Sequence, residues 1–271
     1  MMEDEQELEL ALPNRVRALE TNVLHASDVL YWLDATSAAT MEEMDRVPHA
    51  MQIRFTEKPS DVRVLNSVGR TALWRIPTEP MVQGYATEAQ RTRQAEANYI
   101  VAGEVRDSSG RFNPRTFSAN VGAGSGVGIE LFPTLARTKI PAAGAIHGHI
   151  QFVSDESPAA WALLELEVTV AVNESLTFRA QADKAGDFVL TLNQLPPLPE
   201  SITEYVAVLR VDGNTNLDAD TIPNHANFVA MEMESTTAAD DFQSDLTLTI
   251  RPGENARINS INKNHIAIQP A

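Results

Sequence analysis

The chain of 271 residues contains no cysteine. This absence excludes disulfide bonds, thiol catalysis and thiolate metal sites, and it fits a reducing cytoplasm. Residues 1–7 contain four acidic side chains and no basic one, whereas a secretory signal begins with basic and then apolar residues. No apolar run approaches the roughly eighteen residues that a membrane helix needs. We therefore expect a protein without direct membrane insertion that is cytoplasmic, unless a particle into which it assembles is released.

Basic residues are few. The chain has 21 Lys and Arg against 37 Asp and Glu, which gives a net charge of −16. Such a charge repels phosphate backbones and anionic membranes, and no local cluster of basic residues offsets it. We therefore expect no nucleic-acid partner. Hydrophobic residues make up 43% of the chain and charged residues 21%, as in globular proteins, and the length is sufficient for two domains with separate cores.

Apolar and polar residues alternate through much of the second half of the chain. A period of two predicts strands with one face on a core and the other in water. The same pattern recurs in the first half, in residues 49–55 and 99–106. The sequence therefore predicts an all-β protein. The apolar even positions in the second half are Ile146, Ile150, Phe152, Leu164, Leu166, Val168, Val170, Val172, Leu176, Phe178, Ala180, Phe188, Leu190 and Leu192.

Turn signals and prolines divide the chain into two tandem antiparallel β-sandwich domains. We expect an acidic leader at residues 1–12 and a first sandwich at 13–133, with a polar insertion at 87–98. A linker at 134–143 carries Pro141. The second sandwich is expected at 144–257, followed by a C-terminal tail at 258–271 that docks on a neighbouring protein, with Ile266 as one of its contact residues.

A set of residues in the second sandwich carries a family resemblance. Gly148-His149-Ile150, then Pro158-Ala159-Ala160-Trp161-Ala162, then Asp183 with Gly186 and Phe188, resembles the carboxypeptidase regulatory-like domain. The resemblance is strongest over residues 143–199 and implies a transthyretin-like sandwich that serves as an accessory module. Independently of the family, Gly186 suits the positive φ of a tight turn after Asp183.

The Pro-Ala-Ala-Trp-Ala segment also resembles, more narrowly, accessory proteins of bacterial phage-tail-like contractile injection systems. The chain has neither a His-x-x-Glu pair nor a His-Glu-x-x-His motif for a catalytic zinc ion. The resemblance therefore extends to the regulatory sandwich and not to the peptidase. We predict no catalytic residues and no cofactor.

Two histidines are candidates for metal ligands. His147 and His149 lie two apart on a predicted strand, so their side chains point the same way. Glu165 or Glu167, which share their parity, would supply a third ligand. The alternative is that both histidines lie on the solvent-facing side of a sheet without a metal.

A second candidate is a calcium loop. Oxygen-bearing side chains recur at every second position, at Asp212, Asn214, Asn216 and Asp218, as in EF-hand loops. The sixth position of this loop is Leu217 where an EF-hand has glycine, and the twelfth is Pro223 where it has glutamate. Aspartate and asparagine are also common in long turns, which is the alternative.

Together these observations predict a non-enzymatic structural or adaptor subunit of a large assembly, most plausibly the baseplate, cap or fibre-attachment component of a contractile injection particle. Its partners would be other protein subunits or further copies of this chain. The alternative is a carbohydrate- or calcium-binding sandwich module. A carbohydrate site favours exposed aromatic residues, whereas Trp32, Trp74 and Trp161 all lie in apolar, strand-like contexts that indicate a core.

Overall fold

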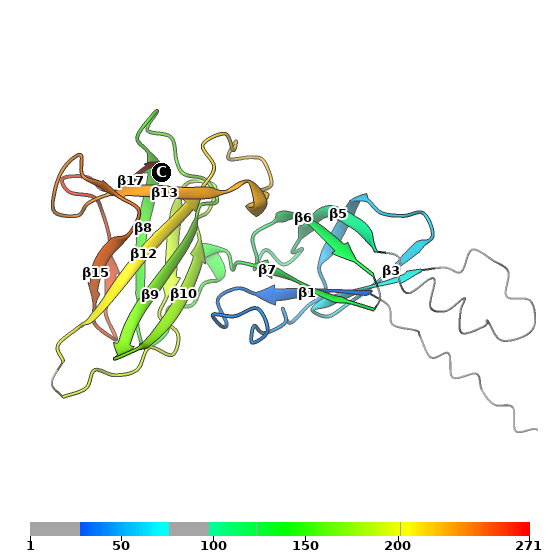
Figure 1. Ribbon diagram of the computed structural model, residues 1–271, viewed down its shortest axis with the longest axis horizontal. Helices are drawn as coiled ribbons and strands as arrows, with labels where there is room; N and C mark the ends of the chain where they lie inside the picture. The colour runs from blue at the N-terminus through cyan, green and yellow to red at the C-terminus, as the bar shows by residue number, and fades with distance from the viewer. Residues whose placement is uncertain (1–27, 76–97, 123, 201) are drawn as a thin grey trace, which may run out of the picture.

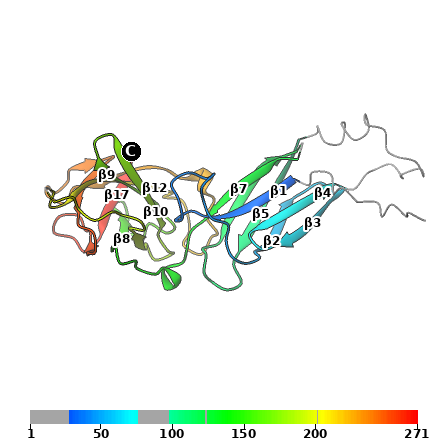
Figure 2. The ribbon, with the colours of Figure 1, turned by 90° about the horizontal axis from the view of Figure 1, so that it is seen from below.

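A computed structural model describes residues 28–75, 98–122, 124–200 and 202–271. These residues form two β-sandwiches placed end to end (Figure 1, Figure 2). The predicted acidic leader and most of the polar insertion at 87–98 lie outside the described residues. In the described part of the chain, no helix is both long enough and apolar enough to cross a membrane.

The first sandwich consists of a four-stranded and a three-stranded sheet. The order of the first sheet is β3-β4-β1-β7 and that of the second is β2-β5-β6. All pairs are antiparallel except β1 and β7, which run parallel along residues 29–34 and 126–131. The strands are β1 (Asp28–Asp34), β2 (Gln52–Glu57), β3 (Val62–Ser67), β4 (Arg70–Arg75), β5 (Tyr99–Arg106), β6 (Arg115–Val121) and β7 (Gly126–Leu131).

Trp32 occupies the centre of the first core. Its side chain is fully buried, and its ring meets that of Phe117 edge-on at 5.5 Å between centroids. Its indole Nε1 donates a hydrogen bond to Thr71 Oγ1 at 3.0 Å, so burying the ring leaves no unpaired donor. Leu30 and Leu73 also lie in this core. The prediction that Trp32 is a core residue is confirmed.

The second sandwich is one sheet that wraps around a single core. Its strand order is β10-β9-β12-β13-β17-β8-β11, with β15 beside β12, β14 beside β13 and β16 beside β8. Two strands change partner along their length: β12 pairs with β15 and then β13, and β8 pairs in parallel with β16 and then β17. The strands are β8 (Ala145–Phe152), β9 (Leu163–Ala171), β10 (Glu174–Gln181), β11 (Asp187–Thr191), β12 (Tyr205–Gly213), β13 (Val229–Glu234), β14 (Phe242–Gln243), β15 (Leu246–Ile250), β16 (Asn255–Arg257) and β17 (Ile266–Pro270).

The predicted alternation holds through the strands of this domain. Leu164, Leu166 and Val168 on β9 are buried, and the glutamates between them face outward. The parity prediction is wrong at Val172, whose side chain is 91% exposed. Val172 lies at the tip of the β9–β10 hairpin, where the next residue, Asn173, has a φ of 64°. The hairpin extends past the end of the core, so its alternation no longer indicates burial.

The turn before β11 is built as predicted. Asp183 Oδ1 accepts hydrogen bonds from the backbone N–H groups of Ala185 and Asp187. Gly186 has a φ of 82°, and a Cβ atom there would lie 2.5 Å from the carbonyl oxygen of Ile150. Both the backbone conformation and the lack of space therefore require glycine at this position.

The residues predicted as a C-terminal tail belong to the second sandwich. β17 lies between β13 and β8, antiparallel to the former and parallel to the latter. The side chains of Ile266 and Ile268 are fully buried in the core. Ile266 is thus not an accessible contact residue, which corrects the expectation of a tail that docks on a neighbour.

Candidate functional site

The best-defined polar site among the described residues is the junction between the two sandwiches. The first sandwich contributes the start of β6 and the end of β7. The second contributes the end of β10, Trp161 and the long connection between β12 and β13, which includes the short 3₁₀ helix η2 (His225–Asn227). The backbone N–H of Thr116 on β6 donates to the carbonyl of Pro223 in that connection at 2.9 Å. The connection thus caps part of a strand edge of the first domain.

Gln181, the last residue of β10, is at the centre of this junction. Its side chain is only 4% exposed. Its Oε1 accepts a hydrogen bond from Asn113 Nδ2 of the first domain at 3.0 Å. Its Nε2 donates to the carbonyl of Trp161 at 3.3 Å and lies 2.9 Å from His225 Nε2. One buried amide therefore joins three segments of the chain. Each of its polar contacts replaces a hydrogen bond to water that these groups would make in the unfolded chain.

His225 is held between aromatic rings. Its ring centroid lies 5.9 Å from that of Phe132 and 5.4 Å from that of Phe228. Burial, reinforced by the positive charge of Arg115, lowers the pKa of His225 to about 3. The neutral ring has one nitrogen without a proton, and the amide of Gln181 donates to it. Nε2 is then the acceptor, and Nδ1 carries the proton.

Arg115 supports the same junction from β6. Its Nη1 donates to the carbonyl of Glu130 at 2.7 Å, and its Nε donates to the carbonyl of Thr116 at 3.3 Å. Burial lowers the pKa of Arg115 to about 10, against the opposing effect of Glu130. The guanidinium remains charged at neutral pH, so protonation of His225 would place a second cation beside it.

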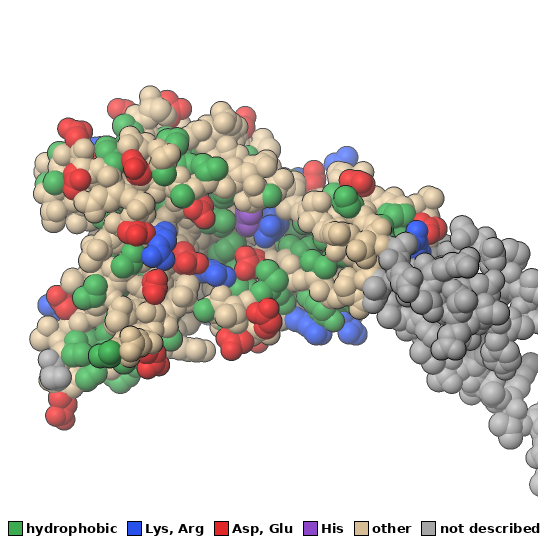
Figure 3. Space-filling view, viewed as in Figure 1, with side chains coloured by type: hydrophobic (Ala, Val, Ile, Leu, Met, Phe, Trp, Pro, Cys, Tyr) green, Lys and Arg blue, Asp and Glu red, His purple; other side chains and the backbone are tan. Residues whose placement is uncertain are grey.

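A row of ion pairs on the second sandwich reaches the first domain at one of its members. Arg179 on β10 contacts Glu130 of the first domain at 3.2 Å and Glu165 on β9 at 3.1 Å. Arg210 on β12 continues the row, at 2.8 Å from Asp245 and 3.3 Å from Glu167. Basic and acidic side chains are interspersed on this face of the second sandwich (Figure 3). Each exposed pair contributes little by itself, and the one pair of this row that joins the domains is the partly buried pair of Arg179 with Glu130.

Trp161 has an unusual backbone conformation at the junction. Its φ of 63° lies in the left-handed region, which is costly for a bulky side chain. Its backbone N–H donates to Asp183, and its indole Nε1 donates to the carbonyl of Ala219 in the β12–β13 connection at 3.1 Å. The side chain is half-buried against this connection. The Pro-Ala-Ala-Trp-Ala segment thus anchors the connection that reaches the first domain, whereas Trp161 was predicted to lie in a core.

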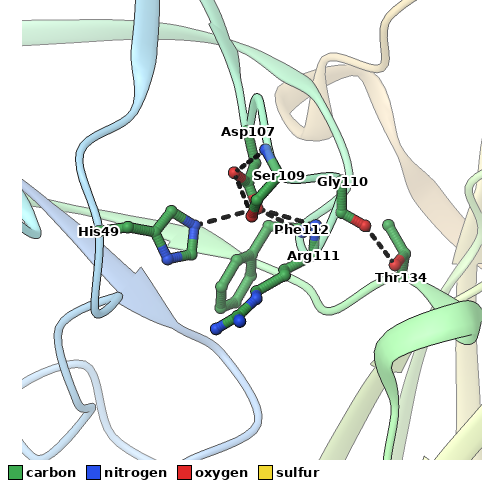
Figure 4. A network of polar contacts seen from close by, with 7 residues as sticks. All are labelled: His49, Asp107, Ser109, Gly110, Arg111, Phe112 and Thr134. Carbon is green, nitrogen blue, oxygen red and sulfur yellow. Dashed lines mark hydrogen bonds and ion pairs between the residues drawn. The ribbon is translucent and has the colours of Figure 1, made fainter.

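The connection between β5 and β6 is organised by one carboxylate, that of Asp107 (Figure 4). Its side chain is fully buried. It accepts hydrogen bonds from the backbone N–H groups of Ser109, Arg111 and Phe112, and His49 Nε2 lies 3.0 Å away. Burial raises the pKa of Asp107, but these donors outweigh burial and hold the pKa below its ordinary value.

This connection in turn holds the interdomain linker. The backbone N–H of Thr134 donates to Arg111, and the Thr134 hydroxyl donates to Gly110 at 2.9 Å (Figure 4). Thr134 precedes the 3₁₀ helix η1 (Leu135–Arg137), whose end is closed by the hydroxyl of Thr138. The linker predicted at 134–143 is therefore fixed to the first domain along its first turn.

The two histidines predicted as metal ligands lie on the outer face of β8, beside a shallow hollow of about 240 Å³. His149 Nδ1 is 3.0 Å from Asp187 Oδ1 on β11, and its ring is 6.5 Å from that of His265. Glu165 and Glu167 do not approach them, since they pair with Arg179 and Arg210 on β10 and β12. Among the described residues, no group of three or more His, Asp or Glu is placed to hold a metal ion.

The predicted calcium loop begins at Asp212 on β12 and continues into the connection between β12 and β13. Asn214 Oδ1 accepts from the backbone N–H of Asn216, and Asp218 Oδ1 accepts from that of Asp220. These oxygens close successive turns of their own backbone. Burial, with a smaller contribution from Glu165, raises the pKa of Asp212. The spacing reflects turns in the connection that docks on the first domain. The local sequence of this connection contains no pattern that predicts its contact with the first domain.

Comparisons with known proteins give little. No protein-family model matches the chain, and no curated protein matches it. Among solved structures, a chain described as "a putative adhesin from Bacteroides ovatus ATCC 8483" has 10% sequence identity and a TM-score of 0.20, over 92% of this chain and 96% of that chain. A TM-score of 0.20 is too low to indicate a shared fold.

Proposed function

We propose that this protein is a non-enzymatic structural or adaptor subunit of a large protein assembly. The observation that carries the proposal is the junction, in which Gln181 bonds to Asn113 and Arg179 pairs with Glu130 across the boundary, and the ring of His225 packs on that of Phe132. A chain that holds two domains at a fixed distance and rotation is suited to spacing or connecting other subunits. Its mechanism would be geometric, and its partners would be proteins.

The junction contrasts with an ordinary flexible link between domains. Domains that move freely are joined by exposed, polar linkers with few contacts across them. Here the first turn of the linker is bonded to the β5–β6 connection, and the β12–β13 connection reaches back across the boundary to Thr116. The first attachment shortens the free part of the linker, and the second supports a rigid spacer, because bending the molecule would require breaking the contact between Thr116 and the β12–β13 connection.

The finer proposal is a component of a phage-tail-like contractile injection particle, at the baseplate, cap or fibre-attachment point. Its support is the resemblance carried by the Pro-Ala-Ala-Trp-Ala segment and the Asp183–Gly186 turn, and the proposal that the second sandwich is transthyretin-like has the same basis. The segment has a structural use in this molecule, since Trp161 holds the connection that docks on the first domain. Its presence is therefore compatible with a role that depends on the relative position of the two domains.

The test is sedimentation of a native lysate of the source cells, followed by mass spectrometry of the fractions that hold this chain. We expect recovery in a very large particle together with sheath and tube proteins. Recovery in a large complex of other composition would keep the adaptor role and reject the injection particle. Migration as a free monomer or small oligomer, in cells where sheath and tube proteins sediment as particles, would contradict both.

A further inference from the structure

A polar hollow of about 270 Å³ lies between the two domains, beside the linker. The end of β1 borders it on one side and β11 on the other, with η1 and the residues after it between them. Small-molecule sites often form at domain boundaries, and their volumes are commonly about 300–1,000 Å³. This hollow is slightly below that range, which suits a ligand of monosaccharide size.

Two cations line this hollow, Arg137 and Lys139. Neither side chain has an ion pair, a hydrogen bond or a ring contact with another described residue. Arg179 and Arg210, by contrast, are engaged by carboxylates. In a chain with a net charge of −16, two unengaged cations at one hollow provide a local site for an anionic group.

The backbone that carries these cations is fixed. The backbone N–H groups of Arg137 and Thr138 both donate to the carbonyl of Thr134. Thr134 is itself bonded to Gly110 and Arg111, in the connection that the buried carboxylate of Asp107 organises. An ordered backbone lowers the entropy that a ligand must overcome when it engages the two side chains.

Hydroxyl and amide groups complete the lining. Thr36 donates its hydroxyl to Asp34 Oδ1, and Asn193 Nδ2 donates to Thr191 Oγ1, which leaves lone pairs on all four side chains, one N–H on Asn193 and the hydroxyl hydrogen of Thr191. These groups both donate and accept, as the hydroxyl groups of a sugar require. Asp34 disfavours an anion at its own end of the hollow, so the anionic group of a ligand would lie toward Arg137 and Lys139.

We propose that this hollow binds a small acidic sugar, whose carboxylate or phosphate meets Arg137 and Lys139 and whose hydroxyl groups meet Asp34, Thr36 and Asn193. The site is independent of the proposed role in an assembly. A ligand here would contact the first domain, the linker and the second domain together, so its binding would also stabilise their relative position.

The test is a titration followed by amide chemical shifts in the full chain, with D-glucuronate and glucose 6-phosphate as probes. Glucose and inorganic phosphate are the neutral and charge-only comparisons. We expect shifts at Thr36, Thr138 and Asn193 with an acidic sugar, weaker binding of both comparison compounds, and loss of affinity as salt is added. Equal binding of glucose would overturn the anionic part of the proposal, and equal binding of phosphate would overturn the sugar part.

A matched pair of double variants localises the effect. Replacing both cations, Arg137→Gln with Lys139→Gln, should weaken binding by at least about tenfold, because each charged hydrogen bond lost costs roughly a factor of ten or more. Arg54→Gln with Arg70→Gln removes the same charge from exposed positions outside the hollow and should leave affinity unchanged. Equal loss in both double variants would show only general electrostatic attraction, and absence of shifts at the three amides would overturn the site itself.

Discussion

His225 shows how one side chain of the second domain depends on its neighbours in the first. Its ring is packed against Phe132 and feels the charge of Arg115, both of the first domain, while Gln181 donates to it from within its own domain. The neutral ring satisfies all of these contacts. A protonated ring would lose its acceptor nitrogen and add a charge beside a guanidinium.

The resulting pH dependence has a definite sign. The pKa of His225 falls from 6.5 to about 3 on folding, so between these values only the unfolded chain takes up a proton. The free energy of unfolding should therefore decrease as the pH falls through this window, by up to about 1.4 kcal/mol per pH unit. Above the window, the stabilising contribution of the neutral His225 should be present in full. His225→Gln keeps a hydrogen-bond acceptor without titrating. Urea denaturation between pH 4.5 and 7 should give a flatter dependence for this variant, and an unchanged slope would contradict a neutral His225.

At the scale of single elements, a substitution in β17 tests whether the C-terminal residues are buried in the second sandwich. Ile268→Ala would remove a fully buried side chain from the core of the second sandwich. We expect a loss of about 2–5 kcal/mol in the free energy of unfolding, measured by urea denaturation. Val172→Ala provides the control, because Val172 is 91% exposed and its truncation should change stability by less than about 0.5 kcal/mol. Similar values for the two variants would argue against a buried β17.

The β5–β6 connection and the linker form a second testable element. Asp107→Asn would replace one acceptor oxygen by an amide that faces the N–H groups of Ser109, Arg111 and Phe112. Loss of a buried, charge-assisted acceptor costs about 1–3 kcal/mol. Hydrogen exchange at the amides of Arg111 and Thr134 should accelerate by about tenfold or more, since each 1.4 kcal/mol of local stability is a factor of ten. Exchange at β9, far from this connection, serves as the internal reference and should stay unchanged.

Alternation predicted most strands of the second sandwich because each has one face on the core. The same reasoning failed for β17, whose five residues contain no long alternating run and whose partner β8 lies more than a hundred positions earlier. It also failed at Val172, because periodicity continues along a hairpin after the core ends. A local pattern reports which way side chains point and contains no information on which distant strand covers them.

The candidate sites show the same limit. The oxygens at Asn214 and Asp218 are regularly spaced in the sequence, and their backbone turns account for that spacing. The residues that join the domains, Asn113, Gln181 and His225, carry no motif and are separated by more than forty positions from one another. They become a site only through tertiary packing, so a reading of single segments does not find them.

At the scale of the whole molecule, the junction decides whether two domains behave as one unit. Because Gln181 bonds to Asn113 and His225 packs on Phe132 across the boundary, we expect a single calorimetric transition with equal calorimetric and van't Hoff enthalpies. The double change Gln181→Ala with His225→Ala keeps the Arg179–Glu130 pair and the Thr116–Pro223 bond, so it should weaken the coupling and broaden the scan toward two transitions, since each sandwich retains its own core. The matched change Gln52→Ala with His147→Ala, on outer faces of the two domains, should keep one transition. Two transitions already in the unmodified protein would mean that the junction contacts are too weak to make a rigid spacer, and the proposed adaptor role would lose its physical basis.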